Sequence, residues 1–339
     1  MDLRNDQSNF VFLACSERSG SNFITKLMNN HSKICGPSTK HIINPLARNY
    51  FRYQPLDKKE HWDELLKDVL NLFNVSFSVW KAEFTLDELR SEVETGDLKG
   101  LIRYFFDKEA VVNGKKHLFI KEIKLYEFYP FLKTFFPESK YIYQVRDPRD
   151  MALSWKKNKT HKGGVVAAAR QWKNDQQQYL KIKALEETSN NIALVRYEDL
   201  VSQTPDQLKM ILDVCGLDFE LEMTEMGKDD LTNKNAQQQK AWENLSKPIM
   251  QDNFNKFKKE LSEDEIKYIE AICFFEMEQF GYLPENKWEA LELVTNKELD
   301  KHHQRELEML EYSPASGVQA NMEAKKVFYQ KIIQSINVS

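Results

Sequence analysis

The apolar run Phe10-Val-Phe-Leu-Ala-Cys15 leads directly into the small and polar residues Ser16-Glu-Arg-Ser-Gly-Ser-Asn-Phe23. A short, continuous apolar run of this kind is typical of a strand that is buried on both faces of a parallel sheet. The residues that follow, Ile24 to Asn30, carry apolar side chains on one face of a helix. The order is strand, small-residue loop and helix, which is the repeating unit of α/β proteins.

The same order recurs along the chain. The further strands that we expect are the apolar runs His117-Leu-Phe-Ile120, Tyr141-Ile-Tyr-Gln-Val145 and Ile192-Ala-Leu-Val195. A helical pattern follows each run, and the last helix has Pro205 in its first turn and Gly216 after its end, as helices prefer. Strands that alternate with helices predict an α/β fold, with a three-layer parallel sheet flanked by helices and right-handed crossovers.

Two regions depart from this alternation. Residues 44–115 show helical periodicity, which predicts a helical insertion over the carboxyl edge of the sheet, where open α/β sheets bind ligands. Residues 283–339 are highly charged, and helices are expected at 288–312 and 322–336. We therefore expect a main domain over residues 1–282 and a helical C-terminal extension over residues 283–339.

Composition narrows the classes of function. The chain has 339 residues and a formal net charge of −4, which argues against a protein that coats nucleic acid. No apolar run approaches the roughly 20 residues of a membrane-spanning helix, and Met1 to Asn9 lack the pattern of a signal peptide. The four cysteines lie far apart and form no CxxC pair. These features predict a cytoplasmic protein without a disulfide framework, a structural metal, or a membrane or nucleic-acid partner.

The loop from Ser16 to Phe23 has the features of an anion-binding turn. Its small residues let the backbone approach a ligand, and the N–H groups that open the following helix have no partner within that helix. Arg18 adds a planar guanidinium that matches the oxygens of a phosphate or sulfate. The loop is P-loop-like, but it lacks the Gly-Lys-Ser/Thr of a Walker A motif. A plain turn with one surface arginine would give the same pattern.

A second polar segment, Arg146-Asp-Pro-Arg-Asp-Met-Ala-Leu-Ser154, follows another predicted strand. Asp147 can cap the helix and Pro148 can open it. Arg146 and Ser154 lie about two helical turns apart, so a long guanidinium and a hydroxyl could hold one phosphate between them. A well-capped helix with a charged surface would also explain the segment.

Together, the two segments resemble the paired signature of sulfotransferases that use 3′-phosphoadenosine 5′-phosphosulfate (PAPS) as sulfuryl donor. The resemblance continues through Tyr197-Glu-Asp-Leu-Val201, Leu245-Ser-Lys-Pro248 and Asn255-Lys-Phe257, and it spans about residues 10–282. The pattern is most similar to tyrosylprotein sulfotransferases and their soluble bacterial relatives. It implies sulfuryl transfer to a hydroxyl or an amine.

The resemblance also implies a role for each matching residue. Arg18 and Lys121 would stabilise the negative charge that grows on the bridging oxygen as the sulfuryl group moves in line. The residues implied around the nucleotide are Arg18, Ser19, Gly20, Ser21, Asn22 and Phe23 for the 5′-phosphosulfate, Arg146 and Ser154 for the 3′-phosphate, Tyr197 for the adenine, and Lys247 and Lys256 for a closing loop. This scheme requires no metal.

Three departures from the tyrosylprotein enzymes bear on the acceptor. The segment from Cys35 to His41 has no carboxylate where those enzymes carry a glutamate base, Ala241 stands where they have a serine, and their membrane anchor has no counterpart. We therefore expect a small-molecule acceptor rather than a tyrosine in a peptide. The general base is either His41, in this segment, or Glu122, beside Lys121.

Two other classes of function share parts of the pattern. A P-loop phosphotransferase should also have a lysine in the loop and an acidic, magnesium-binding strand end. A non-catalytic nucleotide-binding protein of the same fold would not need Lys121. The remaining histidines in polar stretches, His161 among them, are expected to be solvated. Nothing in the pattern indicates a particular oligomeric state.

Overall fold

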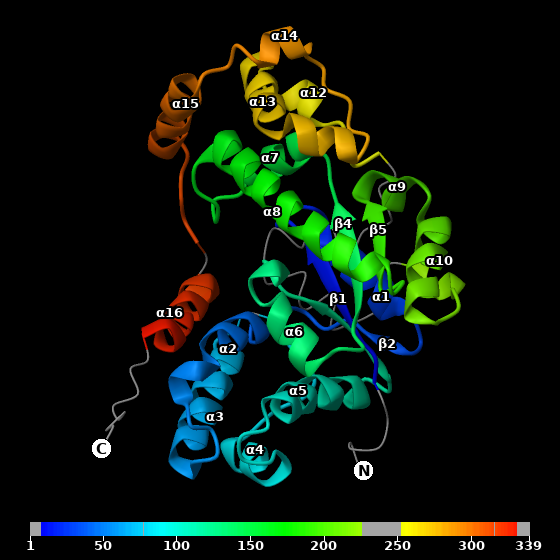
Figure 1. Cartoon of the computed structure of the whole chain (residues 1–339), viewed down its shortest axis with the longest axis vertical. Coiled ribbons are helices and arrows are strands. Elements are labelled where there is room, and N and C mark those ends of the chain that lie inside the picture. Colours follow the sequence, from blue (N-terminus) through cyan, green and yellow to red (C-terminus); the bar gives the residue numbers. More distant parts are fainter. Residues whose placement is uncertain (1–7, 77, 226–251, 315, 331–339) are drawn as a thin grey trace.

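A computed structural model describes residues 8–76, 78–225, 252–314 and 316–330 of the chain. Its centre is a parallel sheet in the order β2-β3-β1-β4-β5 (Figure 1). The strands are β1 (Phe10–Cys15), β2 (Ile34–Cys35), β3 (His117–Lys121), β4 (Lys140–Val145) and β5 (Ile192–Arg196). The predicted α/β fold and its four apolar strands are confirmed. β2 escaped prediction because two residues are too few to show a periodicity.

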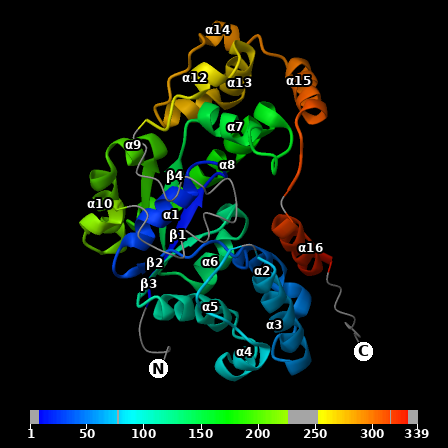
Figure 2. The ribbon, with the colours of Figure 1, turned by 180° about the vertical axis from the view of Figure 1, so that it is seen from behind.

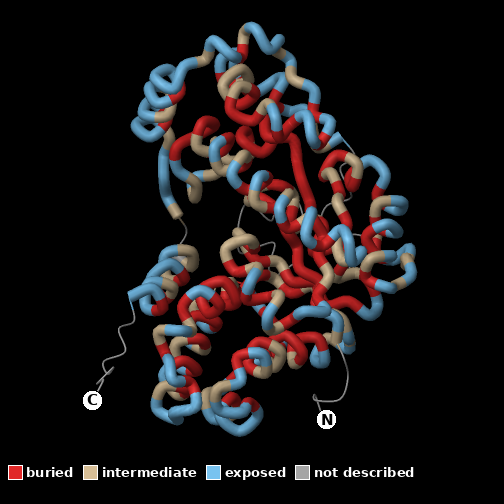
Figure 3. The backbone as a smooth tube through the Cα atoms, viewed as in Figure 1, coloured by how far each residue is buried: buried red, intermediate tan, exposed pale blue. Residues whose placement is uncertain are grey.

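The central strand β1 is buried on both faces, as its apolar run predicts. Alternate residues from Phe10 to Ala14 belong to one hydrophobic cluster, and those from Val11 to Cys15 belong to another. Helices α1 (Ser21–Asn30) and α10 (Thr204–Cys215) contribute to the second cluster, whereas α6 (Tyr129–Phe135) and α8 (Gly164–Glu187) contribute to the first. Figure 3 shows the buried backbone concentrated along these strands, between the helices. The predicted three layers are therefore present.

Two helix boundaries are formed by the residues that the sequence predicts for them. The Asp147 side chain accepts a hydrogen bond from the N–H of Arg149 at 2.9 Å and so caps α7 (Pro148–Lys156). Helix α10 ends at Gly216, which has a φ of 68°. The long helix α8 was not predicted. It packs both against the sheet and against α7, α13 (Glu263–Gln279) and α15 (Asn296–Met309), so its sequence has no single apolar face.

The predicted insertion between β2 and β3 is helical. Its elements are α2 (Ile43–Asn49), a 3₁₀ turn (Tyr50–Tyr53), α3 (Lys59–Asn74), α4 (Leu86–Glu92) and α5 (Leu98–Val112). Aromatic rings join α3 to α5, with the Phe73 and Phe105 centroids 5.2 Å apart and those of Phe84 and Phe105 4.5 Å apart. The insertion therefore packs through apolar and aromatic side chains, and these belong to the same hydrophobic cluster as one face of the sheet.

The C-terminal part of the chain runs across the molecule (Figures 1 and 2). Helices α12 (Phe257–Glu260) and α13 pack on α7, α14 (Trp288–Leu291) packs on α13, and α15 packs on α8. The last helix, α16 (Ser316–Gln330), instead packs on α2 and α3 of the insertion. The helix-prone stretch 288–312 forms two helices, because a capping box between Thr295 and Glu298 starts α15 separately. Helix α16 begins earlier than the predicted residue 322.

Short elements complete the description. They are the 3₁₀ turns Leu125–Glu127 and Leu221–Thr224 and the helix α9 (Tyr197–Ser202). The four cysteines are buried, which agrees with the interpretation of cysteine in apolar surroundings as a small apolar side chain. None of the helices in the described ranges is both long and apolar enough to cross a membrane.

Candidate functional site

The predicted site residues follow the ends of neighbouring strands. β1 lies between β3 and β4, with Leu13 opposite Lys121 and Cys15 opposite Gln144. The loop after β1, Lys121 at the end of β3 and Arg146 after β4 therefore meet at one carboxyl edge, together with Tyr197 after β5. This is the edge at which open α/β sheets bind their ligands.

The turn between β1 and α1 is tight and needs its glycine. Gly20 has a φ of 85°, and a Cβ placed there would lie 2.4 Å from two ring carbons of Tyr197. Arg18 also has a left-handed backbone, with a φ of 64°. The side-chain amide of Gln144, at the end of β4, donates to the carbonyl of Ser19. The first N–H groups of α1 are thus held in a fixed turn that contacts Tyr197.

The two arginines from the two polar segments lie side by side. Arg18 Nε donates to Ser154 Oγ at 3.1 Å, and Arg146 donates to the Arg18 carbonyl at 3.1 Å. The Arg146 guanidinium also stacks over the Tyr197 ring at 4.5 Å. The sequence grouped Ser154 with Arg146, whereas the structure joins Ser154 directly to Arg18. All four predicted residues nevertheless belong to one connected group.

Several polar atoms of this group are buried without a hydrogen-bond partner in the described part of the chain. They include Arg146 Nε and Ser19 Oγ. Neither Arg18 nor Arg146 forms an ion pair within those residues, and burial together with the positive charge of Arg146 lowers the pKa of Arg18. Unpaired buried cations and donors are costly, and phosphate or sulfate oxygens would satisfy them. The residues present therefore fit a polyanionic nucleotide.

The other charged residues of the second segment form a buried scaffold beneath Arg146. Arg149 is 4% exposed and pairs with Asp147 and Glu270, each at 2.7 Å. Asp150 accepts the backbone N–H groups of Asn255 at 2.5 Å and Phe257 at 3.0 Å. The motif in the sequence contains these residues, but it does not reveal their partners, which lie far away along the chain. Their contacts fix the turn that presents Arg146.

Lys121 joins β3 to the start of α1. Its ammonium donates to Asn22 Oδ1 at 2.5 Å, so the predicted catalytic lysine lies beside the predicted phosphosulfate loop. Burial lowers the pKa of Lys121. A cation placed here can act on charge that develops in the reacting group.

The two alternative bases turn out to be neighbours. His41 Nδ1 lies 3.5 Å from Glu122 Oε2, and Glu122 is only 2% exposed. The other carboxylate oxygen of Glu122 accepts the N–H of Ile43 at 3.2 Å, which anchors the pair at the start of α2. Burial lowers the pKa of His41, and so does the positive charge of Lys325, while Glu122 acts in the opposite direction. A histidine oriented by a carboxylate is a common arrangement for a base.

Glu17 and His161 were not predicted as part of the site. His161 Nε2 lies 3.6 Å from Glu17 Oε1 in the loop after β1, and the His161 ring packs on Trp155 with centroids 4.1 Å apart. Burial alone would raise the pKa of Glu17, but the hydrogen bond and charge of His161 lower it. The expectation of a solvated His161 is therefore wrong, because the loop before α8 folds back over the sheet edge.

Of the two lysines predicted to close over the nucleotide, only Lys256 belongs to the described residues. Lys247 lies outside the described residues, as do Leu245-Ser-Lys-Pro248 and Ala241. Lys256 is described and is exposed at the start of α12. Asn253, three residues earlier, donates to the Tyr197 hydroxyl at 2.6 Å, and its carbonyl accepts from Arg146 at 3.3 Å. This segment is thus connected to the predicted adenine residue.

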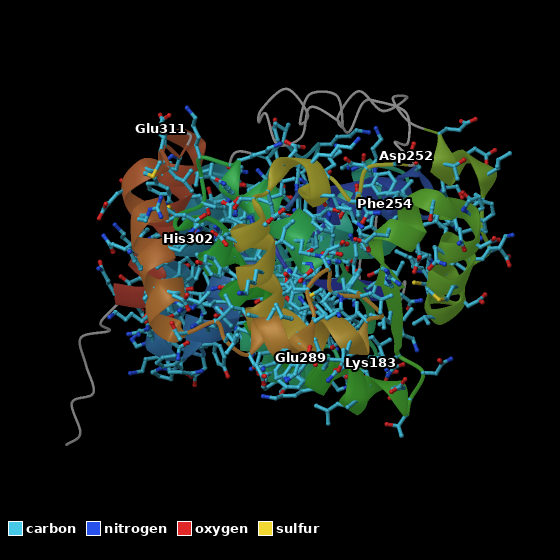
Figure 4. All side chains as sticks on the ribbon, turned by 90° about the horizontal axis from the view of Figure 1, so that it is seen from above. Lys183, Asp252, Phe254, Glu289, His302 and Glu311 are labelled. Carbon is cyan, nitrogen blue, oxygen red and sulfur yellow. The ribbon has the colours of Figure 1, made fainter. Side chains whose placement is uncertain are left out.

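One group of potential metal ligands occurs in the described ranges, at Glu265, His302 and Glu306. Figure 4 labels His302, which lies on α15 with Glu306, while Glu265 lies on α13. Glu265 pairs with Lys156, and Glu306 accepts the N–H of Val165 at 2.8 Å, so both carboxylates already have protein donors. The contact of Glu306 with Val165 attaches α15 to the start of α8.

Comparisons with known proteins concern the family and the fold of the chain. A model of the sulfotransferase family matches residues 11–221. The fold is similar to a solved sulfotransferase domain from the curacin biosynthetic pathway, with 18% identity, a TM-score of 0.54, and coverage of 82% of this chain and 99% of that domain. It is also similar to the sulfotransferase domain of the Synechococcus PCC 7002 olefin synthase, with 20% identity, a TM-score of 0.51, and coverage of 80% and 97%. No curated protein sequence matches the chain significantly.

Proposed function

The chain belongs to the sulfotransferase family, and from that membership we propose that it transfers a sulfuryl group from PAPS to a hydroxyl or amine of a small-molecule acceptor. The observation that carries the proposal is the pair of adjacent arginines at the sheet edge. Arg146 donates to the Arg18 carbonyl at 3.1 Å, and neither guanidinium has an ion-pair partner in the described part of the chain. Two uncompensated cations beside a helix N-terminus favour a ligand with several negative charges.

The arrangement supports the assignment of different residues to different parts of the nucleotide. Arg18 and the N–H groups of Ser19 to Phe23 would bind the 5′-phosphosulfate, and Arg146 with Ser154 would bind the 3′-phosphate. Tyr197, which stacks on Arg146 at 4.5 Å, would contact the adenine. Lys256 and Lys247 would lie over the bound nucleotide from the following segment.

The chemical step needs positioning and charge stabilisation. The acceptor attacks sulfur in line, the bond from sulfur to the bridging phosphate oxygen breaks, and that oxygen becomes negative. Lys121 and Arg18 would stabilise this charge, and the contact of Lys121 with Asn22 at 2.5 Å holds the ammonium at the loop. The acceptor proton would pass to His41, which Glu122 orients.

Nucleotide binding tests the proposal directly. We expect 3′-phosphoadenosine 5′-phosphate (PAP) to bind more tightly than adenosine 5′-phosphate, because a charge-assisted contact contributes about 1.5–3 kcal/mol, or roughly 10- to 150-fold. Calorimetry with both nucleotides, and with ATP and magnesium, measures the difference.

The control is a pair of arginine variants. Arg146→Gln should remove most of the preference for PAP, whereas Arg170→Gln, an exposed arginine on α8, should retain it. Equal affinity of the wild type for PAP and adenosine 5′-phosphate would contradict the proposal, and tighter binding of ATP with magnesium would favour a phosphotransferase.

A further inference from the structure

We infer that the C-terminal helix α16 forms the outer wall of the acceptor site, and that Lys325 and Asn321 on its inner face bind a carboxylate group of the acceptor. The inference rests on the proposed function, because it assigns the acceptor of that reaction. It concerns residues beyond 221, where the match to the family ends.

The segment that leads into α16 crosses from the loop between α7 and α8 to the insertion. The N–H of Ser313 donates to the carbonyl of Lys159 at 2.8 Å, and the Lys162 ammonium lies 4.3 Å from the Tyr312 ring. Both contacts attach the segment before α16 to the loop between α7 and α8. That loop carries His161, which contacts Glu17. One end of the crossing is therefore fixed beside the phosphosulfate loop.

The other end is fixed on the insertion. Phe328 of α16 is fully buried, and its ring centroid lies 6.0 Å from that of Tyr53. Arg48 of α2 lies 5.8 Å from the ring of Tyr329. Helix α2 begins at Ile43, two residues after His41. In Figures 1 and 2, α16 lies alongside α2 and α3 in both views. The segment thus spans from the Glu17 side of the site to the His41 side.

Lys325 is half-buried and lies on the face of α16 that also carries the buried residues Asn321 and Phe328. Burial lowers the pKa of Lys325, and the charges that act on it are Glu122 and Glu17. Its own charge reaches His41, whose pKa it lowers. In the described ranges Lys325 forms neither a hydrogen bond nor an ion pair, while Glu122 is held by Ile43 and Glu17 lies against His161. A half-buried ammonium with neither a hydrogen bond nor an ion pair in those ranges can bind an anion.

Asn321 provides a second donor on the same face. It lies four residues before Lys325, a spacing that places two side chains next to each other on a helix. Asn321 is 3% exposed, and its Nδ2 has no hydrogen-bond partner among the described residues. An unsatisfied buried amide is destabilising, so a ligand atom that accepts its hydrogen bond is favoured.

The two donors suit one carboxylate. An ammonium and an amide can each take one of its two oxygens, with a single negative charge to compensate a single positive one. A dianionic group such as a phosphate monoester would be repelled more strongly, because Glu122 and Glu17 already place two carboxylates near Lys325. The acceptor that we infer is a hydroxyl or amino compound that also carries a carboxylate.

The test uses full-length protein saturated with PAP. The probes are 3-hydroxydecanoate, 4-hydroxyphenylacetate and 3-hydroxybutyrate, each compared with its methyl ester by calorimetry. We expect at least one acid to bind 10-fold or more tightly than its ester. Lys325→Gln should remove that preference without changing the affinity for PAP, and Lys325→Arg should keep most of it. The neighbouring exposed residue provides a matched control, since Lys326→Gln should behave as the wild type.

The outcomes separate the inference from the proposed function. If PAP binds but no acid exceeds its ester, or if Lys325→Gln weakens acid and ester equally, the carboxylate site is wrong and the proposed function stands. If PAP itself does not bind, the proposed function fails and the inference with it.

Discussion

The proposed nucleotide half and the proposed acceptor half of the site differ in how far apart their residues lie in the sequence. The nucleotide half consists of residues 18–23, 146–154 and Tyr197, which follow three strands. The acceptor half draws Glu17, His41, Glu122, His161 and Lys325 from separate segments. Residues that follow a strand share one backbone turn, so a motif can carry them together. Residues that meet only through packing leave no local pattern, and their contacts can change without altering the fold.

The largest effect should come from breaking the acceptor half. His41→Ala should lower kcat by about 10²–10⁴-fold, the usual contribution of a general base, and leave PAP affinity unchanged. The rate of the wild type should fall at low pH with a midpoint below about 6.5, because burial lowers the pKa of His41. The measurement is the pH dependence of kcat/KM.

Two further variants should shift the pH range of this low-pH decrease in rate (the limb) in opposite directions. Lys325 lowers the pKa of His41, so Lys325→Gln should move the limb to higher pH. Glu122 raises that pKa, so Glu122→Gln should move the limb to lower pH. Lys121 faces His41 from β3 and also lowers its pKa, and it remains in both variants. Shifts in the same direction for both variants would show that His41 is not the titrating group.

The next largest effect should come from the scaffold under the nucleotide half. Arg149→Met should lower the free energy of unfolding by about 3–5 kcal/mol, because it leaves Asp147 and Glu270 without their cation. The exposed pair of Arg170 and Asp300 provides the control, and Arg170→Met should cost no more than about 1 kcal/mol. Urea denaturation measures both. Similar losses would mean that the buried network does not support the turn at Arg146.

The smallest effect concerns the fit of the loop against Tyr197. Gly20→Ala should lower stability by roughly 1–3 kcal/mol and weaken PAP binding, because a Cβ would meet the Tyr197 ring and the φ of 85° is strained. Gly216 also has a positive φ, of 68°, but a Cβ placed there would meet no atom within 4 Å, so Gly216→Ala is the control. The difference between the two variants in thermal unfolding and in PAP affinity isolates the ring contact. Equal losses, with PAP affinity unaffected, would argue against a shaped nucleotide loop.

The sequence was sufficient for the fold, and it placed the residues proposed for the nucleotide half directly after the strands that bring them to one sheet edge. Apolar runs locate β1, β3, β4 and β5, and Asp147 and Gly216 carry the signals of helix ends. The sequence was not sufficient to predict helices that are buried on more than one face, or contacts between residues from distant segments. Helix α8 is covered on more than one face, so its periodicity is weak.

The acceptor half shows the same limit. His41 and Glu122 were predicted as alternatives because nothing in the sequence reveals that they lie 3.5 Å apart. Glu17 and His161 were missed because a single charged residue in a loop has no local pattern. The position of Lys325 depends on how α16 packs on the insertion, which no spacing in the sequence encodes.

The most direct test of the central claim is transfer of the sulfuryl group itself. The protein is incubated with ³⁵S-labelled PAPS and a set of hydroxy and amino acids, and both labelled product and released PAP are measured. The account predicts equal amounts of sulfated acceptor and PAP, and Lys121→Ala should lower both by about 10²–10³-fold while PAP still binds. PAP binding without any acceptor-dependent release of PAP would contradict the account and would identify a non-catalytic nucleotide-binding protein.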